Sequence, residues 1–544
     1  MKKQYFFNCA LLLISLASCT KNKVDLIISN ANIYTADSTF SQASAMAIDD
    51  GKIIAIGNSV DIQTKYSSSK TIDAKGNTIF PGFIDAHCHF TGFATDSWKC
   101  NLFGTTSFDD VVFKIKEYSK TAPLEWIYGR GWDQNDWKNK QYPSKEILDS
   151  LFPNRPVFLK RVDGHAALLN QKALDLAGIN INTKIDGGEV EIKNGKLTGI
   201  LIDNAMHVAE KKVPEISDAL AKKYFIDMQA TCFAAGLTGV HDCGISEHTV
   251  ELLKDAQKNN ALKMKIFALL SDDSTYYDRW IKSGPLKKGS LHVGGFKFYA
   301  DGALGSRGAC LIHDYADKKD WKGFLLNTEN HFKTAAEKFA KSDLQMCTHA
   351  IGDSGNRIIL KIYADVLKEK NDKRWRIEHA QVMDASDFHF FGEYNIIPSV
   401  QPTHATSDMY WAQDRVGTKQ IKTSYAYKQL LQTNNWMPLG TDFPVEDIDP
   451  LKTFFAAVVR QDSKGFPTNG FQMENALTRK EAIYGITLWA AKAAFEEKEK
   501  GSIEVGKAAD LIMLDTDLMT CNKEKILSTK VLATWLNGEK VYGK

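Results

Sequence analysis

The sequence predicts an α/β fold, a (β/α)8 TIM-like barrel with additions. The 544-residue chain is too long for one small domain. Its middle part repeats one rhythm, in which a short apolar strand precedes a helical stretch with apolar residues every three to four positions. Eight such strands can be marked, and they are NTIFPGFIDAHCHF, GLTGVHDC, KMKIFALLS, GGFKFYADG, DLQMCTHAIGD, RWRIEHAQ, NIIPSVQP and WMPLGTDFP. Such a barrel carries its active site at the C-terminal ends of the strands.

The composition is that of a large globular protein without a strong charge. Hydrophobic residues make up 44% and charged residues 25% of the chain, and the formal net charge is +2. These values exclude a disordered chain and a multi-span membrane protein. Nucleic acid is not a predicted partner, because phosphate binding normally requires a clear basic excess. We expect a small-molecule substrate instead.

The first 18 residues have the layout of a secretory signal peptide, with Lys2 and Lys3 before a short apolar stretch. The tetrad Leu16-Ala17-Ser18-Cys19 resembles the lipobox of bacterial lipoproteins, which implies a lipid on Cys19; ordinary cleavage nearby is the alternative. By the same resemblance, Thr20 favours sorting to the outer membrane, on either its periplasmic or its surface face. Loss of the two lysines leaves equal numbers of basic and acidic side chains. The lipid is therefore the only predicted membrane contact.

Both ends of the chain are rich in short predicted strands. This pattern of short strands covers residues 19–79 and 500–544, and a hairpin turn is predicted at Asp50-Gly51. Because neither end has enough strands to bury a sheet face alone, the two predict one split β-sandwich domain. Residues 80–499 form the predicted barrel. Within it, residues 99–234 exceed a normal connection and predict an inserted subdomain that roofs the active site.

Metal-binding side chains follow several of the barrel strands. His87 and His89 end the first strand, and residues two apart on a strand point to the same side. His349 ends the fifth strand, His379 the sixth, and Asp442 the eighth. A single histidine at a strand end is more often a packed structural residue, but this set meets at one rim. Imidazoles with one carboxylate are typical ligands of zinc and similar divalent metals.

Nine passages resemble the metal-dependent amidohydrolase superfamily, and more narrowly amidohydrolase family 3, the branch that includes N-substituted formamide deformylases. They are PGFIDAHCHF, RVDGHAALLN, GLTGVHD, FKFYADGALGSR, HAIGD, RIEHAQ, QPTHATSDM, GTDFPVE and GSIEVGKAADLIMLD. The resemblance covers nearly the whole mature chain. It implies an enzyme that hydrolyses carbon–nitrogen bonds other than peptide bonds, with one or two divalent ions, above all zinc, per chain.

The resemblance also implies roles for single residues. His87 and His89 match the ligands of the more buried metal, and His349 and His379 match those of a second metal. Asp442 matches the aspartate that contacts metal and shuttles a proton. In the implied mechanism a metal-held hydroxide attacks the amide carbonyl, while Asp442 takes up its proton and returns it to the leaving nitrogen.

Other roles are less closely defined by the resemblance. Lys297 matches a lysine that family members carboxylate to bridge two metals; an unmodified lysine would favour one ion. His404, expected at the end of the seventh strand, would donate to the oxyanion or the substrate. Arg307 would hold a substrate carboxylate or fix a loop, and His241 and Asp242 would orient ligand imidazoles. Three residues of the predicted insert would contact substrate or form a structural network, namely Trp132, Asp133 and His165.

Two alternatives to amide hydrolysis stay open. The same fold and metals could act on a cyclic amide, deaminate a base or cleave an ester, because the fold does not decide the substrate. From another class, a catalytically silent, lipid-anchored binding protein would keep the barrel without turnover. The oligomeric state is equally open, and a homodimer is one of the states it allows.

Overall fold

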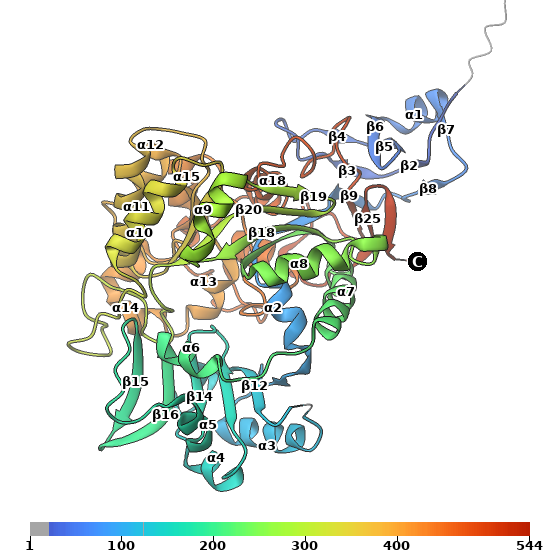
Figure 1. Cartoon of the computed structure of the whole chain (residues 1–544). Coiled ribbons are helices and arrows are strands. Elements are labelled where there is room, and N and C mark those ends of the chain that lie inside the picture. The colour runs from blue at the N-terminus through green and yellow to red at the C-terminus, as the bar shows by residue number, and fades with distance from the viewer. Residues whose placement is uncertain (1–20, 123, 544) are drawn as a thin grey trace, which may run out of the picture.

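The computed structural model describes residues 21–122 and 124–543, which form an α/β barrel with an inserted β-sheet and further sheets built from the chain ends (Figure 1). The predicted signal peptide and Cys19 lie outside the described residues. Within the described part of the chain, no helix combines the length and the apolar character needed to cross a membrane.

Seven parallel strands build the barrel sheet, and they confirm the predicted fold class. In spatial order they are β10 (Phe83–Cys88), β17 (Leu237–Ile245), β18 (Lys265–Ser271), β20 (Leu291–Tyr299), β21 (Gln345–Ala350), β22 (Arg376–His379) and β23 (Ile397–Ser399). The eighth predicted strand lies between β23 and β10: Leu439 bridges to Val400 in parallel, and its carbonyl accepts a hydrogen bond from the N–H of Ala86 at 3.1 Å. The segment therefore closes the barrel next to its first strand.

Helices follow the strands and cover the outside of the barrel (Figure 1). They include α8 (Glu247–Ala256), α9 (Ser274–Ser283), α10 (Glu329–Phe339), α11 (Asp353–Leu367), α12 (His389–Tyr394), α15 (Tyr427–Asn434), α17 (Arg479–Gly485) and α18 (Leu488–Ala493). Several begin at a side-chain cap. Ser246, for example, accepts a hydrogen bond from the N–H of Thr249 at 3.0 Å, which satisfies a free donor in the first turn of α8.

The first predicted strand is two strands in the structure. β9 (Thr78–Pro81) pairs with β24 (Leu511–Leu514), whereas β10 pairs with β17 in the barrel. Gly82 separates them, and a Cβ atom there would lie 2.3 Å from Thr238 Cγ2. Any residue larger than glycine would clash with Thr238 at this position. A single apolar run in the sequence therefore forms strands in two different sheets, with Gly82 between them.

Gly440 lets the closing segment approach the first strand. A Cβ atom at this position would lie 2.5 Å from the backbone nitrogen of His87 and 2.8 Å from Asp85 Oδ1. We expect Gly440→Ala to lower the free energy of unfolding by about 2 kcal/mol, because it overpacks a buried backbone contact. Urea denaturation measures this. Gly57→Ala is the matched control, since its Cβ would meet only Ile62 at 3.9 Å; equal losses in both variants would contradict the packing argument.

The insert after the first barrel strand carries a mixed six-stranded sheet. Its spatial order is β11 (Cys100–Asn101), β12 (Ile127–Trp132), β13 (Val157–Arg161), β14 (Ala166–Leu169), β16 (Lys196–Asp203) and β15 (Gly188–Lys193), with α3 (Phe108–Ser119), α4 (Glu146–Leu151), α5 (Gln171–Ala177) and α6 (Asn204–Glu210) around it. The helix α7 (Asp218–Ala234) also falls within the range predicted for the insert, but it packs against α2 (Phe90–Thr95), α8 and β17. It therefore serves as a helix of the barrel.

The two chain ends meet in a pair of small sheets. One has the order β6 (Lys52–Gly57), β5 (Ala45–Asp49), β2 (Leu26–Ser29) and β8 (Thr71–Asp73); the other has β26 (Glu539–Tyr542), β25 (Val531–Leu536), β24, β9, β3 (Asn32–Tyr34) and β4 (Gln42–Ala43). Ile28 and Met46 from the first share a buried cluster with Leu511 and Trp535 from the second. This apolar cluster joins segments almost 500 residues apart in the chain.

Candidate metal centre and active site

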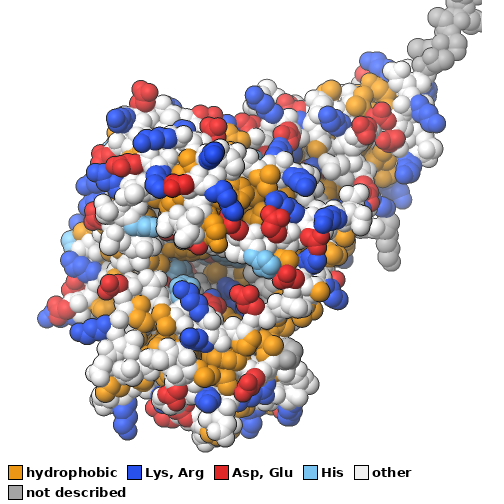
Figure 2. All heavy atoms as spheres, in the orientation of Figure 1, with side chains coloured by type: hydrophobic (Ala, Val, Ile, Leu, Met, Phe, Trp, Pro, Cys, Tyr) orange, Lys and Arg blue, Asp and Glu red, His pale blue; other side chains and the backbone are white. Residues whose placement is uncertain are grey.

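A cavity of about 710 Å³ lies between the strand ends of the barrel and the inserted sheet. Figure 2 shows the molecule hollowed on this face, with histidine side chains visible in the hollow. The barrel contributes the lining residues His89, Lys297, His349, His379, His404 and Asp442, and the insert contributes Arg130, Asp133, Lys160, Arg161, Asp163 and His165. The cavity thus contains most of the residues that the sequence singled out.

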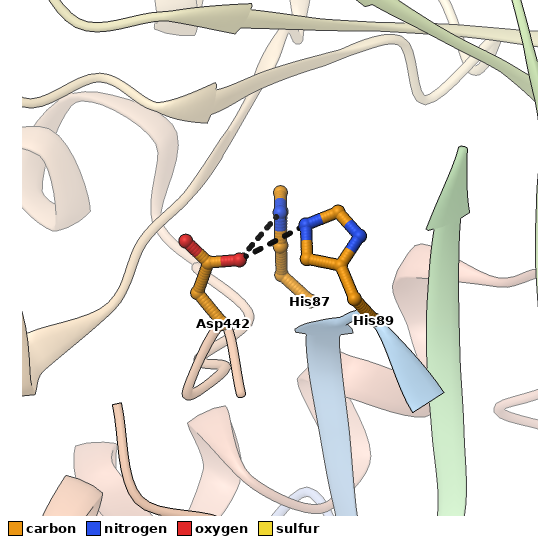
Figure 3. Close-up of side chains that lie close together, drawn as sticks. All are labelled: His87, His89 and Asp442. Atoms are coloured by element: carbon orange, nitrogen blue, oxygen red, sulfur yellow. Dashed lines mark ion pairs between the residues drawn. The ribbon is translucent and has the colours of Figure 1, made fainter. Parts of the chain in front are cut away.

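The first-strand histidines point at the closing segment of the barrel (Figure 3). Asp442 Oδ1 lies 3.5 Å from His87 Nε2 and 3.2 Å from His89 Nε2. The backbone N–H of Asp442 donates to the carbonyl of His87 at 2.7 Å, which ties the two segments together. Asp442 also has a left-handed φ of 63°, a conformation that costs energy outside glycine. The three donor groups lie within 4.8 Å of one another, close enough to share one ion.

The histidines of the fifth and sixth strands extend this group. The rings of His349 and His379 are 4.6 Å apart, and those of His87 and His379 are 4.8 Å apart. His379 and His404 form a further donor set with Asp442. Lys297 is fully buried on β20, and its Nζ lies 3.2 Å from His87 Nε2. The predicted ligands therefore form one continuous cluster.

The charge states of these groups suit a divalent cation. Burial lowers the pKa of His349 and of His379 well below the ordinary value, and it lowers the pKa of His404 to about 4, so these imidazoles are neutral. Burial acts to raise the pKa of Asp442, but the neighbouring His89 and His87 hold it well below its ordinary value. His404 Nε2 is buried without a hydrogen-bond partner among the described residues. Neutral imidazoles around an ionised carboxylate, with an unsatisfied nitrogen, fit a metal and its substrate.

Two residues that the sequence did not single out orient the candidate ligands. Glu378 Oε2 lies 2.6 Å from His87 Nδ1, and Gln401 Oε1 lies 2.7 Å from His379 Nδ1. Partners of this kind hold an imidazole in the tautomer whose other nitrogen faces the metal. The motif RIEHAQ contains a signal for Glu378, because a carboxylate directly precedes a ligand histidine.

The predicted orienting residues have other partners. His241 Nδ1 lies 3.2 Å from Arg376 Nη1, and Asp242 accepts a hydrogen bond from the N–H of Thr91 at 3.0 Å. Within the described residues, neither is hydrogen-bonded to a candidate ligand imidazole. His241 and Asp242 instead join strand β17 to its surroundings inside the barrel.

Trp132 and Arg307 lie outside the cavity lining, as does the fully buried candidate ligand His87. His404 lines the cavity but has a different local structure from the one predicted. Trp132 is buried, and its Nε1 donates to the carbonyl of Leu159 at 2.7 Å, so it is a core residue of the insert rather than a substrate contact. Arg307 donates to both carboxylate oxygens of Asp317, at 3.1 and 2.7 Å, and fixes a loop. His404 lies in α13 (Pro402–Asp408), the helix after the seventh strand, rather than at the strand end.

Asp133 and His165 line the cavity from the insert side. Arg161 binds both Asp133 and Asp163 through its guanidinium group. His165 Nδ1 lies 2.6 Å from Asp203 Oδ1, and its ring is 5.1 Å from that of His349. Each residue thus belongs to a structural network and also faces the space where substrate would lie.

Comparisons with known proteins agree with this geometry. A sequence model of the amidohydrolase family matches residues 70–542. The chain is 31% identical to Protein LONG AFTER FAR-RED 3 of Arabidopsis thaliana, over 95% of this chain and 91% of that protein. It is 28% identical to the N-substituted formamide deformylase of Arthrobacter pascens, over 94% and 97%. The crystal structure of an uncharacterized metal-dependent hydrolase from Pyrococcus horikoshii aligns at a TM-score of 0.74 and 26% identity, over 92% of this chain and 99% of that one. The chain belongs to the amidohydrolase family, in the branch predicted from its motifs, and is a hydrolase.

Proposed function

We propose that the protein hydrolyses a non-peptide C–N amide bond in a small molecule of the N-acyl or N-substituted formamide type. One observation carries the proposal: an ionised carboxylate, Asp442, lies among buried neutral imidazoles at the mouth of the barrel, inside a cavity large enough for a small substrate. Similarity to an N-substituted formamide deformylase over nearly the whole length of both chains supports the bond type.

We further propose that the cluster holds one or two divalent ions, with zinc as the preferred metal. The ligands would be His87, His89 and Asp442 for one ion, and His349, His379 and a carboxylated Lys297 for a second. A divalent cation supplies an activated water near neutral pH and polarises an amide carbonyl. Burial of Lys297 beside His87 supports the bridging role, since the structure gives this amine no solvent contact.

The chain's own groups would handle the proton and the developing charge. Asp442 is ionised, so its carboxylate can accept a proton from the attacking water and return it to the leaving nitrogen. His404 is neutral, and its unpartnered Nε2 lies 3.7 Å from Asp442 Oδ2, so an N–H at this position can donate to the carbonyl oxygen as negative charge develops.

Metal analysis together with a substrate panel tests the proposal. The purified protein should contain one or two zinc or similar ions per chain, and the metal-loaded enzyme should hydrolyse N-formyl and N-acyl amines. The panel also includes cyclic amides, aminated bases and esters. If only cyclic amides, only aminated bases or only esters are turned over, that class replaces N-formyl and N-acyl amines as the proposed substrate. Full activity in a metal-free protein would overturn the metal assignment.

Arg307→Ala should leave kcat/KM within about twofold of the wild-type value, because Arg307 pairs with Asp317 outside the cavity lining. Steady-state kinetics on a neutral amide and on a carboxylate-bearing amide measures this. Asp317→Asn is the companion variant, since it breaks the same pair from the other side and also removes the Asp317–Arg415 pair. A large loss confined to the carboxylate-bearing substrate in Arg307→Ala, but not in Asp317→Asn, would restore a substrate-binding role.

We also propose that the mature protein is anchored to the bacterial outer membrane by a lipid on Cys19. The lipobox-like tetrad Leu16-Ala17-Ser18-Cys19 supports this. Mass spectrometry of the N-terminal peptide should find a diacylglyceryl-modified Cys19 that is lost in Cys19→Ser. Release of an unmodified wild-type protein into the soluble fraction would contradict it.

A further inference from the structure

One wall of the cavity, beside the metal cluster, carries two carboxylates. Asp408 is the last residue of α13 and lies one helical turn beyond His404, so the two share a face of the helix. Glu446 follows Asp442 by four residues on the segment that closes the barrel. Both side chains line the cavity together with Trp411. A substrate whose amide lies between His404 and Asp442 would therefore reach this wall.

Hydrogen bonds hold Asp408 and Glu446 in place, but neither carboxylate forms an ion pair with a basic side chain among the described residues. Asp408 Oδ2 accepts hydrogen bonds from the Tyr425 hydroxyl at 2.8 Å and from Gln381 Nε2 at 3.1 Å. Glu446 Oε1 accepts from the Ser407 hydroxyl at 2.6 Å. Among the described residues, no lysine, arginine or histidine forms an ion pair with either carboxylate. Each group thus has one oxygen fixed by neutral donors and one oxygen free for a ligand.

Arg161 is the nearby cation that might have neutralised this wall. Its Nε donates to Gln134 Oε1 at 2.8 Å, and its other nitrogens bind Asp133 and Asp163. Two carboxylates already share this one guanidinium, so Arg161 leaves a net negative charge on its own side of the cavity. Arg161 acts through space to lower the pKa of Asp408, but among the described residues it forms no ion pair with that carboxylate.

Burial makes these uncompensated charges costly. It raises the pKa of Asp408 to about 7, and the nearby Asp133 and Asp163 add to that rise. It raises the pKa of Glu446 to about 8, and the nearby Asp408 and Asp442 add to that rise. Both side chains are half-buried, and a half-buried carboxylate without a counter-charge is unfavourable unless a ligand provides one. A cation seated between the two would restore both to the ionised state.

Two further observations point to a ligand at this wall. Trp411 is only 8% exposed and lines the cavity, and the Arg415 guanidinium lies 5.5 Å from the centre of its ring, which shows that the ring attracts cations. His404 is also only 8% exposed and lines the same cavity, and its buried Nε2 has no hydrogen-bond partner among the described residues. The cavity therefore has a polar nitrogen, His404 Nε2, at one end. Its other end has two carboxylates and the ring of Trp411. Such a pocket suits a molecule that is polar at both ends.

We propose that the substrate carries a positively charged ammonium or guanidinium group beyond its amide, bound between Asp408 and Glu446 and against Trp411. The inference rests on the proposed amide hydrolysis and narrows its substrate class to singly acylated or formylated diamines and their guanidino analogues. The neutral amide lies at His404 and Asp442, while the cation lies one helical turn away. The insert closes the other side of the cavity.

A pair of substrates of equal length tests this on the metal-loaded enzyme. A mono-N-formylated diaminobutane carries the terminal ammonium, and N-pentylformamide replaces that ammonium with a methyl group. We expect kcat/KM to favour the cationic substrate by about tenfold or more, as for a charged hydrogen bond. Asp408→Asn and Glu446→Gln should each lower this preference, and the double variant should bring it near one. Equal use of both substrates by the wild type would overturn the inference.

Asp447→Asn is the matched control. Asp447 adjoins Glu446 in the chain but pairs with Lys452 and does not line the cavity, so this variant should keep the wild-type preference. If neither formamide is hydrolysed, the proposed function fails, and binding decides the inference separately. Calorimetry should then find that diaminobutane binds the wild type about tenfold more tightly than the double variant. Equal binding would contradict the cation site.

Discussion

Replacing Asp442 by asparagine should lower kcat by about a thousandfold while the barrel stays folded. The asparagine keeps the size of the side chain, but it cannot take up a proton from water or return it to the leaving nitrogen. Asp442 approaches His87, His89 and His404 together, at 3.5, 3.2 and 3.7 Å. Its pKa is held well below the ordinary value, so the carboxylate is ionised near neutral pH.

Kinetics of the metal-loaded enzyme on an N-formyl amine measure this loss. Circular dichroism and bound metal per chain should be recorded for the same sample, so that a folding defect is separated from a chemical one. Asp447→Asn removes a carboxylate five residues away, on the exposed side of the same segment, and should keep the wild-type kcat. A folded, metal-loaded Asp442→Asn enzyme with undiminished kcat would remove the proton-transfer role from Asp442.

The barrel was predictable because its pattern is local. Each strand is a short apolar run, and a helical stretch follows it, so the order of elements is visible without distant contacts. The positions of His349 and His379 followed from the same pattern. Residues at the ends of neighbouring parallel strands must meet, and the structure places their rings 4.6 Å apart.

The residues that the sequence missed depend on distant contacts. Glu378 lies 291 positions from His87, and strand alternation would turn it away from the side that its neighbour His379 faces. His379 does not follow strand alternation, because its φ is 77°. No local pattern in the sequence indicates this left-handed conformation. The motif around Trp132 allows either a substrate contact or a structural role, and only the folded insert, whose residues bury Trp132, distinguishes the two.

Glu378 orients His87, the first candidate metal ligand. Its Oε2 lies 2.6 Å from His87 Nδ1, and both side chains are fully buried. Burial acts to raise the pKa of Glu378, but His87, Arg376 and Lys297 lower it to about 2, so the group is a carboxylate. An anionic acceptor holds the proton on Nδ1 and leaves the lone pair of Nε2 directed at the metal. The negative charge of Glu378 also makes the imidazole of His87 a stronger electron-pair donor to the metal.

Glu378→Gln should therefore weaken metal binding by about 10- to 100-fold, because a neutral amide replaces the anionic acceptor. Competition with a chromophoric chelator measures the metal Kd without any need for turnover. Glu496→Gln is the matched control: Glu496 is a buried carboxylate that pairs with His292 and Lys500 and contacts no candidate ligand, so its loss lowers stability without moving the metal Kd. An unchanged metal Kd in Glu378→Gln, or an equal rise in both variants, would show that His87 binds metal without its buried partner.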